Sequence, residues 1–401
     1  MLMAGKGMAT TPTVRESSWY IWSTVARRAL SYLRQQPEVA RDRIGAFGVS
    51  MGGTTIWSFA LDPRLKAACA IYGCGWNRYY RHTPRYGVSE KLPAMTEDDR
   101  VWLAGMAPEG CAPFIKCPVL FLSAANDNYG NMDRAYGTLA RMLANVERRQ
   151  AFTPRFCHHI GADFDQNLFL WMGTWLKGGP AWPRSPVARI TLGPDGVPAM
   201  AVTADRSAEV ERVAIYYAVE NHRTVSRNWR EAAVVRAGAA WRATLPVLNT
   251  GAFLFAFANV RYKSGVHLTS NEEAVIPFAL GVATATDAVS RMLYDGSDGT
   301  GLWFSESPCT GLRFKIFTAA GEVFKVTLHA NYSWPGQKTW EASVTLTGQP
   351  GWQTITLAPS DFKAQEPGGV PVNFAHCETL QLTGPWKDRN IVFTDFQWVT
   401  Q

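Results

Sequence analysis

The segment Gly48-Val49-Ser50-Met51-Gly52-Gly53 constrains the fold more than any other part of the sequence. The apolar run 44–48 leads into it, and an apolar run with helical spacing, 54–61, follows it. Glycines two positions before and two positions after a serine leave room for a very tight turn between a strand and a helix. We therefore expect a strand, a sharp turn and a helix, with Ser50 exposed at the turn. In that geometry the Met51 backbone N–H would point toward a developing oxyanion.

Strand-like and helix-like segments alternate through the first 180 residues. Apolar runs free of polar residues indicate buried parallel strands, and Ser17 or Ser18 would cap the first helix. This order predicts a parallel α/β sheet. The expected strands are 44–48, 67–72 and 118–123, and the expected helices are 17–36, 54–61 and 132–149.

The pattern changes after Gly178-Gly179-Pro180. Short alternating stretches follow, such as Val213, Ile215 and Tyr217, and no segment with helical spacing is evident. The predicted fold class is therefore α/β plus all-β, a parallel sheet followed by two β-sandwich modules. We expect domains at residues 1–180, 183–280 and 284–401.

Composition excludes several classes of function. The net charge is only +7, and basic residues occur in pairs rather than runs, so we expect no nucleic-acid partner. No apolar stretch reaches the ~18–20 residues that cross a bilayer, and residues 1–15 lack the apolar centre of a signal peptide. We expect no membrane span. The seven cysteines form no CxxC pair, so we expect no metal site and no cofactor, although Cys309 and Cys377 would be able to pair in an exported protein.

Candidate partners for Ser50 follow later strands. Asp127 lies just beyond the expected strand 118–123, where a loop carboxylate can orient an imidazole. Asp133 is the alternative acid, six residues later on the expected helix. His158 and His159 both precede a stretch with helical spacing, and the pattern alone does not separate them.

These motifs together resemble a known family. IGAFGVSMGG, KCPVLFLSAANDNYGNMDRA and CHHI before WMGTWLKG, within residues 44–178, are similar to the catalytic half of bacterial α/β-hydrolases of the dienelactone-hydrolase-like or acetylxylan-esterase-like type. The resemblance implies Ser50 as nucleophile, Asp127 as acid and His158 as base. His158 is implied over His159 because it directly follows the position held by Cys157.

The resemblance also implies a partial sheet. A complete fold of this family has several strands before the helix expected at 17–36, and only about 16 residues precede that helix here. The loop that supplies a second oxyanion N–H would be missing with those strands. The strand 43–48 would then be an open edge, which leads us to expect that the chain is either marginally stable or pairs this edge with another chain.

The β modules resemble known sandwiches. Residues 183–280 are similar to an immunoglobulin or fibronectin type III fold, and residues 284–401 to the galactose-binding jelly roll of carbohydrate-binding modules. Six tryptophans lie in the latter stretch, and each one is either a sugar platform or a core residue. They are Trp303, Trp334, Trp340, Trp352, Trp386 and Trp398. In the first part, Trp76 would either line a substrate cleft or pack under a loop.

Two functions fit these features. The first is a serine carboxylic-ester hydrolase acting on a small ester or an acylated carbohydrate, secreted or periplasmic by analogy, whose chemistry on small esters survives in a fragment ending near residue 180. The alternative is an impaired hydrolase remnant that acts as a carbohydrate-binding or assembly protein.

Overall fold

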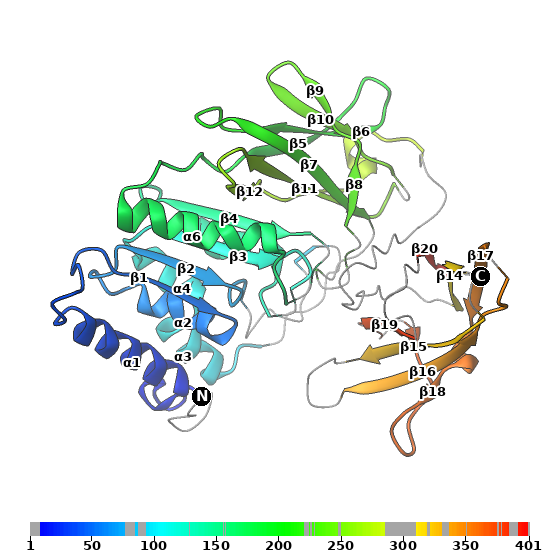
Figure 1. Ribbon diagram of the computed structural model, residues 1–401, viewed down its shortest axis with the longest axis horizontal. Helices are drawn as coiled ribbons and strands as arrows, with labels where there is room; N and C mark the ends of the chain where they lie inside the picture. Colours follow the sequence, from blue (N-terminus) through cyan, green and yellow to red (C-terminus); the bar gives the residue numbers. More distant parts are fainter. Residues whose placement is uncertain are drawn as a thin grey trace.

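The computed structural model has three parts that follow one another along the chain (Figure 1). An α/β part is followed by two parts built only from β-strands and short 3-10 helices, which confirms the predicted fold class. The structure describes residues 9–76, 85–86, 94–127, 129–154, 156, 158–219, 224, 227, 229–247, 250–284, 310–318, 321–330, 337–349, 351–374, 377, 379–384 and 392–399.

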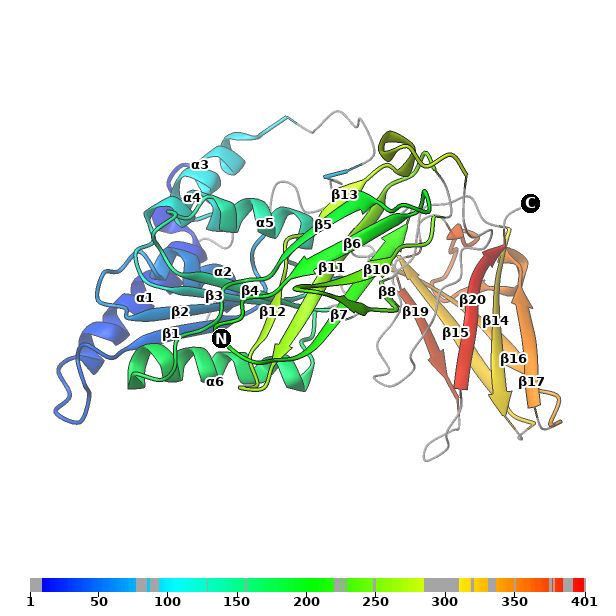
Figure 2. The ribbon, with the colours of Figure 1, turned by 90° about the horizontal axis from the view of Figure 1, so that it is seen from above.

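The first part is a parallel sheet with the strand order β1-β2-β3-β4. Its strands are β1 (Gly45–Val49), β2 (Ala67–Ile71), β3 (Val119–Ala124) and β4 (Arg148–Thr153). Helix α6 covers one face, and α2 and α5 cover the other (Figure 2), so every residue of β2 and β3 is buried. The helices are α1 (Ser18–Leu33), α2 (Met51–Phe59), α3 (Glu97–Gly105), α4 (Pro108–Cys111), α5 (Met132–Ala140) and α6 (Ala162–Lys177), with 3-10 helices at Val14–Glu16 and Ala112–Phe114.

Two elements differ from the sequence prediction. The helix expected at 132–149 ends at Ala140, and its last two residues open strand β4. Arg148 and Gln150 alternate with buried residues, and Gln150 Nε2 donates to the Thr269 carbonyl of the next part. These polar residues interrupt the apolar run by which a buried strand is recognised. Helix α3 was not predicted. A capping box between Thr96 and Asp99 starts it, and this is a signal readable in the sequence.

The second part is a sandwich of two antiparallel sheets. One sheet has the order β5-β6-β10-β9, and the other has β12-β11-β7-β8 with β13 also paired to β11. The strands are β5 (Val187–Leu192), β6 (Pro198–Thr203), β7 (Val210–Val219), β8 (Arg230–Ala232), β9 (Val235–Ala237), β10 (Ala240–Thr244), β11 (Leu254–Tyr262), β12 (His267–Thr269) and β13 (Glu273–Val275), followed by a 3-10 helix at Pro277–Leu280.

The third part has its own core between two further sheets, β17-β14-β20 and β18-β16-β15-β19. Alternate residues of β14 and β15 are fully buried in that core, as their period-two pattern predicts. The strands are β14 (Gly311–Thr318), β15 (Val323–Ala330), β16 (Lys338–Thr345), β17 (Gly351–Leu357), β18 (Lys363–Ala364), β19 (Thr379–Thr383) and β20 (Val392–Val399), with a 3-10 helix at Pro359–Asp361.

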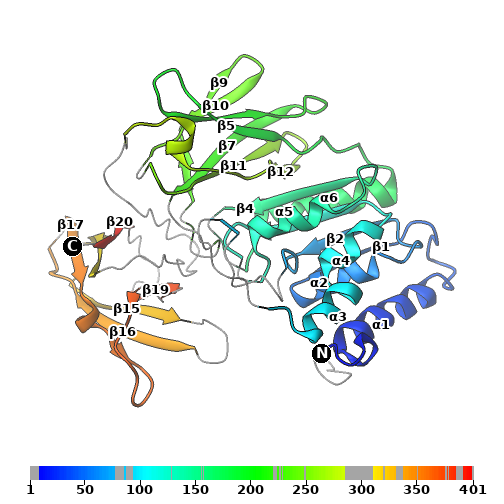
Figure 3. The same cartoon turned by 180° about the vertical axis from the view of Figure 1, so that it is seen from behind.

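The second part closes the β4 edge of the parallel sheet. Figures 1 and 3 show β12 beside β4. The Phe152 N–H donates to Thr269 Oγ1 at 2.8 Å, and the Phe152 carbonyl accepts from Asn259 Nδ2 at 3.1 Å. Side chains of the sandwich therefore satisfy outward backbone groups that another strand would otherwise pair.

The hydrophobic core also continues across this junction. Trp171 of α6 and Trp182 belong to the same buried cluster as Ile190 and Ile215 of the sandwich. Every residue of β11 but one is buried, because its sheet packs against the opposite sheet on one face and against the α/β part on the other. The boundary expected near residue 180 falls between α6 and β5 along the chain, but the core does not break there.

The opposite edge, β1, is open. Among the described residues no strand pairs with its outer side. Phe47 is 58% exposed and Val49 51% exposed, so apolar side chains remain uncovered at this edge. The described residues 9–16 lie elsewhere, because the Thr10 backbone N–H and hydroxyl both bind Asp98 of α3.

Candidate active site

Ser50 occupies a strained turn between β1 and α2. Its backbone dihedrals are φ 58° and ψ −118°, a region that residues with a side chain rarely adopt. Gly48 is required here, since a Cβ on it would lie 2.4 Å from the Gly52 carbonyl oxygen. Gly53 is required as well, because its Cβ would lie 2.2 Å from the Ile71 carbonyl oxygen. A Cβ on Gly52 would meet nothing within 4 Å, so the expected need for a small residue at that position is wrong.

The structure brings Ser50, His158 and Asp127 together although they are far apart in the sequence. His158 Nε2 lies 2.8 Å from Ser50 Oγ, and His158 Nδ1 lies 2.7 Å from Asp127 Oδ2. Both distances are those of hydrogen bonds. The carboxyl ends of parallel strands and the loops that follow them provide all three residues, from β1, β3 and β4.

The environment of Asp127 keeps its carboxylate in one place. The residue is fully buried, and its Oδ1 accepts hydrogen bonds from the Tyr129 N–H at 2.7 Å and from the Gly130 N–H. The other carboxylate oxygen faces the imidazole. The alternative acid, Asp133, lies in the first turn of α5 and is engaged by Arg227.

Two tyrosines that the sequence did not single out surround the imidazole of His158. The Tyr72 ring lies 4.2 Å from it, tilted by 33°, and the Tyr129 ring meets it edge-on at 5.9 Å. Tyr72 directly follows β2 and has a φ of 60°, so the chain reverses there as it does at Ser50. His159, the neighbouring candidate, packs its ring on Phe156 at 5.4 Å instead.

Met51 lies next to Ser50 at the start of α2, whereas Trp76 lies beside α5. Met51 is the first residue of α2, where a helix leaves its N–H without an intrahelical acceptor. The Trp76 ring lies under the Arg141 guanidinium of α5, 5.7 Å away, and its Nε1 approaches Gly137. That position matches the packing alternative considered for Trp76 and is on the α5 side of the loop.

A buried carboxyl lies behind the Tyr72–Trp76 loop. Glu109 of α4 is almost fully buried, and burial raises its pKa to about 7 even though the Trp76 backbone N–H hydrogen-bonds to it and so opposes the shift. Burial also raises the pKa of the nearby Cys74 thiol well above its usual range. Such a thiol is a packing group rather than a nucleophile.

In the described part of the chain, no group of three or more His, Cys, Asp and Glu side chains is arranged to hold a metal ion. No described helix is both long enough and apolar enough to cross a membrane. Cys377 is a free buried thiol. Cys309, considered as its partner in a disulfide, lies outside the described residues, as does Cys157.

Residues 13–151 match the dienelactone hydrolase family. The matched range includes Ser50 and Asp127 and ends before His158. The part of the chain with the parallel sheet described above, hereafter the hydrolase part, is thus similar to that family. A comparison with curated proteins gives no match.

Solved structures with partial similarity include two acetyl xylan esterases and a peptidase. Acetyl xylan esterase 1 from Thermoanaerobacterium sp. JW/SL YS485 is 18% identical over 37% of this chain and 51% of its own, with a TM-score of 0.31. The Paenibacillus sp. R4 acetyl xylan esterase is 16% identical over 41% and 55%, with a TM-score of 0.35. The Pyrococcus horikoshii acylaminoacyl peptidase is 20% identical over 40% and 28%, with a TM-score of 0.31. The chain thus spans about half the length of the two esterases.

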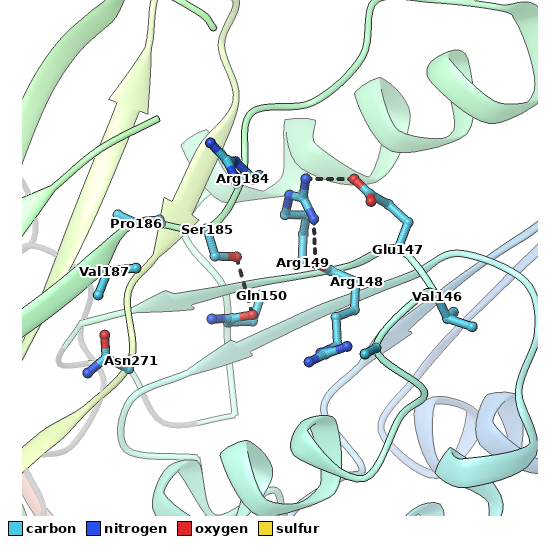
Figure 4. Close-up of a pocket in the computed structure, with 11 residues that line it drawn as sticks. Val146, Glu147, Arg148, Arg149, Gln150, Arg184, Ser185, Pro186, Val187 and Asn271 are labelled. Carbon is cyan, nitrogen blue, oxygen red and sulfur yellow. Dashed lines mark hydrogen bonds and ion pairs between the residues drawn. The ribbon is translucent and has the colours of Figure 1, made fainter. Parts of the chain in front are cut away.

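A groove between the hydrolase part and the sandwich lies away from Ser50. Figure 4 shows its lining, with Arg148 and Arg149 from the amino end of β4 and Arg184 from the following segment. Ser50 follows the carboxyl end of a parallel strand, so the groove is at the other end of the sheet. The Arg149 guanidinium already binds Glu147 at 2.6 Å and the Pro183 carbonyl at 2.5 Å.

The six tryptophans considered as sugar platforms or as core residues are only partly described. Trp340 is buried in the core of the third part and donates to the Val370 carbonyl at 2.9 Å. Trp303, Trp334 and Trp386 lie outside the described residues, as do the side chains of Trp352 and Trp398.

Proposed function

We propose that the chain is a serine carboxylic-ester hydrolase in which Ser50, His158 and Asp127 act as a catalytic triad. The observation that carries the proposal is the pair of hydrogen bonds from His158, 2.8 Å to Ser50 Oγ and 2.7 Å to Asp127 Oδ2, at a strained elbow. A serine, an imidazole and a buried carboxylate in this order activate a hydroxyl for attack on a carbonyl carbon.

The proposed reaction has two halves. Ser50 Oγ attacks the ester carbonyl and its proton passes to His158 Nε2, while Asp127 stabilises the resulting imidazolium. The Met51 N–H donates to the oxyanion, and the amino end of α2 adds a favourable potential. His158 then gives the proton to the departing alcohol. In the second half His158 deprotonates a water molecule, which attacks the acyl-enzyme and releases the carboxylic acid and free Ser50.

We propose further that the ester is carried on a carbohydrate, and that the protein acts outside the cytoplasm. Two β parts follow the hydrolase part, and the support for a carbohydrate is the resemblance of residues 284–401 to a carbohydrate-binding jelly roll, which is an analogy of fold. Retention of the full chain on insoluble acetylated xylan, compared with retention on cellulose, tests this substrate class. Equal recovery in the unbound fraction with both polymers would argue against it.

A fluorophosphonate probe and p-nitrophenyl acetate test the triad directly. Ser50→Ala should lose labelling and lower the hydrolysis rate by several decades, with a melting temperature within a few degrees of the wild type. His158→Ala should do the same. His159→Ala is the matched control and should keep most activity, because its ring packs on Phe156 away from Ser50. Hydrolysis by Ser50→Ala within tenfold of the wild type would refute the proposal.

The alternative function, an impaired hydrolase that binds or assembles, is favoured by one observation. The β1 edge directly before Ser50 is open and carries exposed apolar side chains. A wild type that is neither labelled nor active, but still binds a glycan or associates with itself, would favour this alternative.

A further inference from the structure

Three polar side chains flank the proposed acid, on the loop between β3 and α5 and in the first turn of α5. They are Asn126, Asn131 and Asp133, and all three are buried. Asn131 is the N-cap of α5 and accepts a hydrogen bond from the Arg134 N–H at 3.2 Å. Asp127 is thus held within a short polar segment whose own position needs partners.

The partners come from the sandwich, about 100 residues further along the chain. Asn126 Nδ2 donates to the Thr224 carbonyl at 3.0 Å and to the Arg227 carbonyl at 2.6 Å. The Thr224 hydroxyl donates to Asn131 Oδ1 at 3.2 Å. Thr224 and Arg227, hereafter together called the clamp segment, therefore bind the acid loop on both sides of Asp127.

Arg227 adds an ion pair to these hydrogen bonds. Its Nη1 and Nη2 lie 2.7 and 2.9 Å from the two carboxylate oxygens of Asp133, and Nη1 is also 2.7 Å from Glu272. The guanidinium carbon lies 3.7 Å above the Phe255 ring, and the side chain is fully buried. A two-pronged pair of this kind fixes direction as well as distance, so it holds the first turn of α5 against the sandwich.

Two carboxyls and one guanidinium share this buried cluster. Burial opposes ionisation of Asp133, but the Arg227 guanidinium overcomes it and lowers the pKa of that carboxyl. Burial and the neighbouring Asp133 raise the pKa of Glu272 well above its usual range. Ionisation is therefore favoured at Asp133, which pairs with Arg227, and disfavoured at Glu272.

We propose that the clamp segment positions Asp127 for its role in the triad, with Arg227 as the positioning residue. The inference rests on the proposed function, in which Asp127 orients His158. A displacement of about 1 Å can cost about 100-fold in rate even when the chemistry is untouched. The sandwich would then be a working part of the active site, not only an attached module.

Three variants of the full chain test this. Arg227→Ala removes the ion pair with Asp133. Asn126→Ala keeps that ion pair but removes the two hydrogen bonds that Asn126 donates to the clamp segment. The second variant therefore tests the proposal even if the first does not fold. Thr269→Val is the matched control, because it removes a buried hydrogen bond between the same two parts, at Phe152, without touching the acid loop.

We expect Arg227→Ala and Asn126→Ala to lower kcat for p-nitrophenyl acetate about 10- to 100-fold per fluorophosphonate-reactive site, with little change in KM. The acid limb of the kcat/KM profile should move to lower pH, since an imidazolium farther from Asp127 is less stabilised. Thr269→Val should keep the wild-type kcat and pH profile. Wild-type kcat and pH profile in Asn126→Ala, measured on folded protein, would overturn the proposal.

A second measurement separates this proposal from the proposed function. The downfield proton resonance of an imidazole N–H bound to a carboxylate reports the His158–Asp127 contact whether or not the protein turns over an ester. Loss of that resonance in Asn126→Ala but not in Thr269→Val supports the positioning role even in an inactive wild type. If the resonance persists in both variants, the positioning role of the clamp segment is contradicted. Ester hydrolysis by the wild type would still support the proposed triad in that case.

Discussion

Three residues other than glycine have a positive φ in the described part of the chain, and all lie in the two turns that flank the active site. They are Ser50, Tyr72 and Trp76. Such backbone conformations cost of order 1–3 kcal/mol each and persist where surrounding contacts enforce them. The Ser50 N–H donates to the Ile71 carbonyl at 2.9 Å and the Tyr72 N–H to the Leu122 carbonyl at 2.8 Å. The strained turns are thus tied to β2 and β3, the two strands buried throughout.

Glu109 should make the stability of the protein depend on pH. An acid whose pKa is raised in the folded state binds its proton more tightly there than in the unfolded chain. The pKa of Glu109 is raised from an ordinary value of 4.5 to about 7. The free energy of unfolding should therefore fall as the pH rises from about 4.5 to 7, by roughly 3 kcal/mol in total, and then level off.

Glu109→Gln should remove this dependence. Urea unfolding at pH 5 and pH 8 measures it, with the change in unfolding free energy between the two pH values compared for the variant and the wild type. The comparison is internal to each protein, so the constant cost of burying an amide cancels. Parallel curves for the two proteins would show that Glu109 is not protonated in the folded state.

At the scale of elements, the adjacent glycines Gly52 and Gly53 of α2 differ in how much space a side chain would have. Gly53→Ala would place its Cβ 2.2 Å from the Ile71 carbonyl, so α2 would have to move away from β2. Gly52→Ala meets open space inside a helix, where alanine is favoured by up to about 1 kcal/mol.

We expect Gly53→Ala to lower the melting temperature and the soluble yield, and Gly52→Ala to leave both unchanged or slightly raised. Thermal unfolding followed by circular dichroism measures this. Equal destabilisation by the two substitutions would contradict the geometry of the turn.

Elements with a strong local signal were predictable from the sequence, and those shaped by a distant partner were not. The elbow follows from GVSMGG between two apolar runs, and α1 from Ser17 and its helical spacing. Strand β4 was missed because it begins with polar residues whose partners are distant in the sequence: Arg149 Nε donates to the Pro183 carbonyl and Gln150 Nε2 to the Thr269 carbonyl.

The same reasoning applies to the candidate site. Ser50 and Asp127 follow strands that can be recognised locally, and the alternatives Asp133 and His159 are distinguished only by where their side chains point. Tyr72 and Tyr129 carry no motif of their own. Arg227 is an ordinary residue in the sequence, and its importance arises only when folding places it beside Asp133.

At the scale of the whole molecule, the continuous core changes what we expect from truncation. The sequence alone favoured an active fragment ending near residue 180. That fragment would lose the Asp133–Arg227 ion pair and would expose the apolar cluster around Trp171. Both losses would reduce the ~5–15 kcal/mol that stabilises a domain.

We therefore expect residues 1–180 to be insoluble or unreactive toward a fluorophosphonate, and residues 1–284, which retain the sandwich, to be soluble and labelled. Soluble yield and labelling of the two fragments measure the difference. A soluble, labelled 1–180 fragment would show that the hydrolase part is independent of the sandwich.

The open β1 edge should make the protein associate with itself. It presents an uninterrupted strand without charge or proline, which are the usual protections of an edge. Light scattering should find a species larger than the 44.4 kDa chain, and Phe47→Lys should shift it toward the monomer. Val187→Lys, at an apolar side chain 65% exposed on the sandwich, is the control and should leave the size unchanged. A monodisperse wild-type monomer would contradict the prediction.

In the described part of the chain, only one of the two edges of the hydrolase sheet is open, and this would limit how many chains can join through it. Thr269 and Asn259 occupy the β4 side, so a neighbouring chain can be added only beyond β1. Through this sheet each chain would be monovalent, like an end-capped monomer that stops growth after one addition. Two copies that meet through β1 satisfy each other around a two-fold axis and leave nothing for a third, so the product is a closed pair and not a fibre.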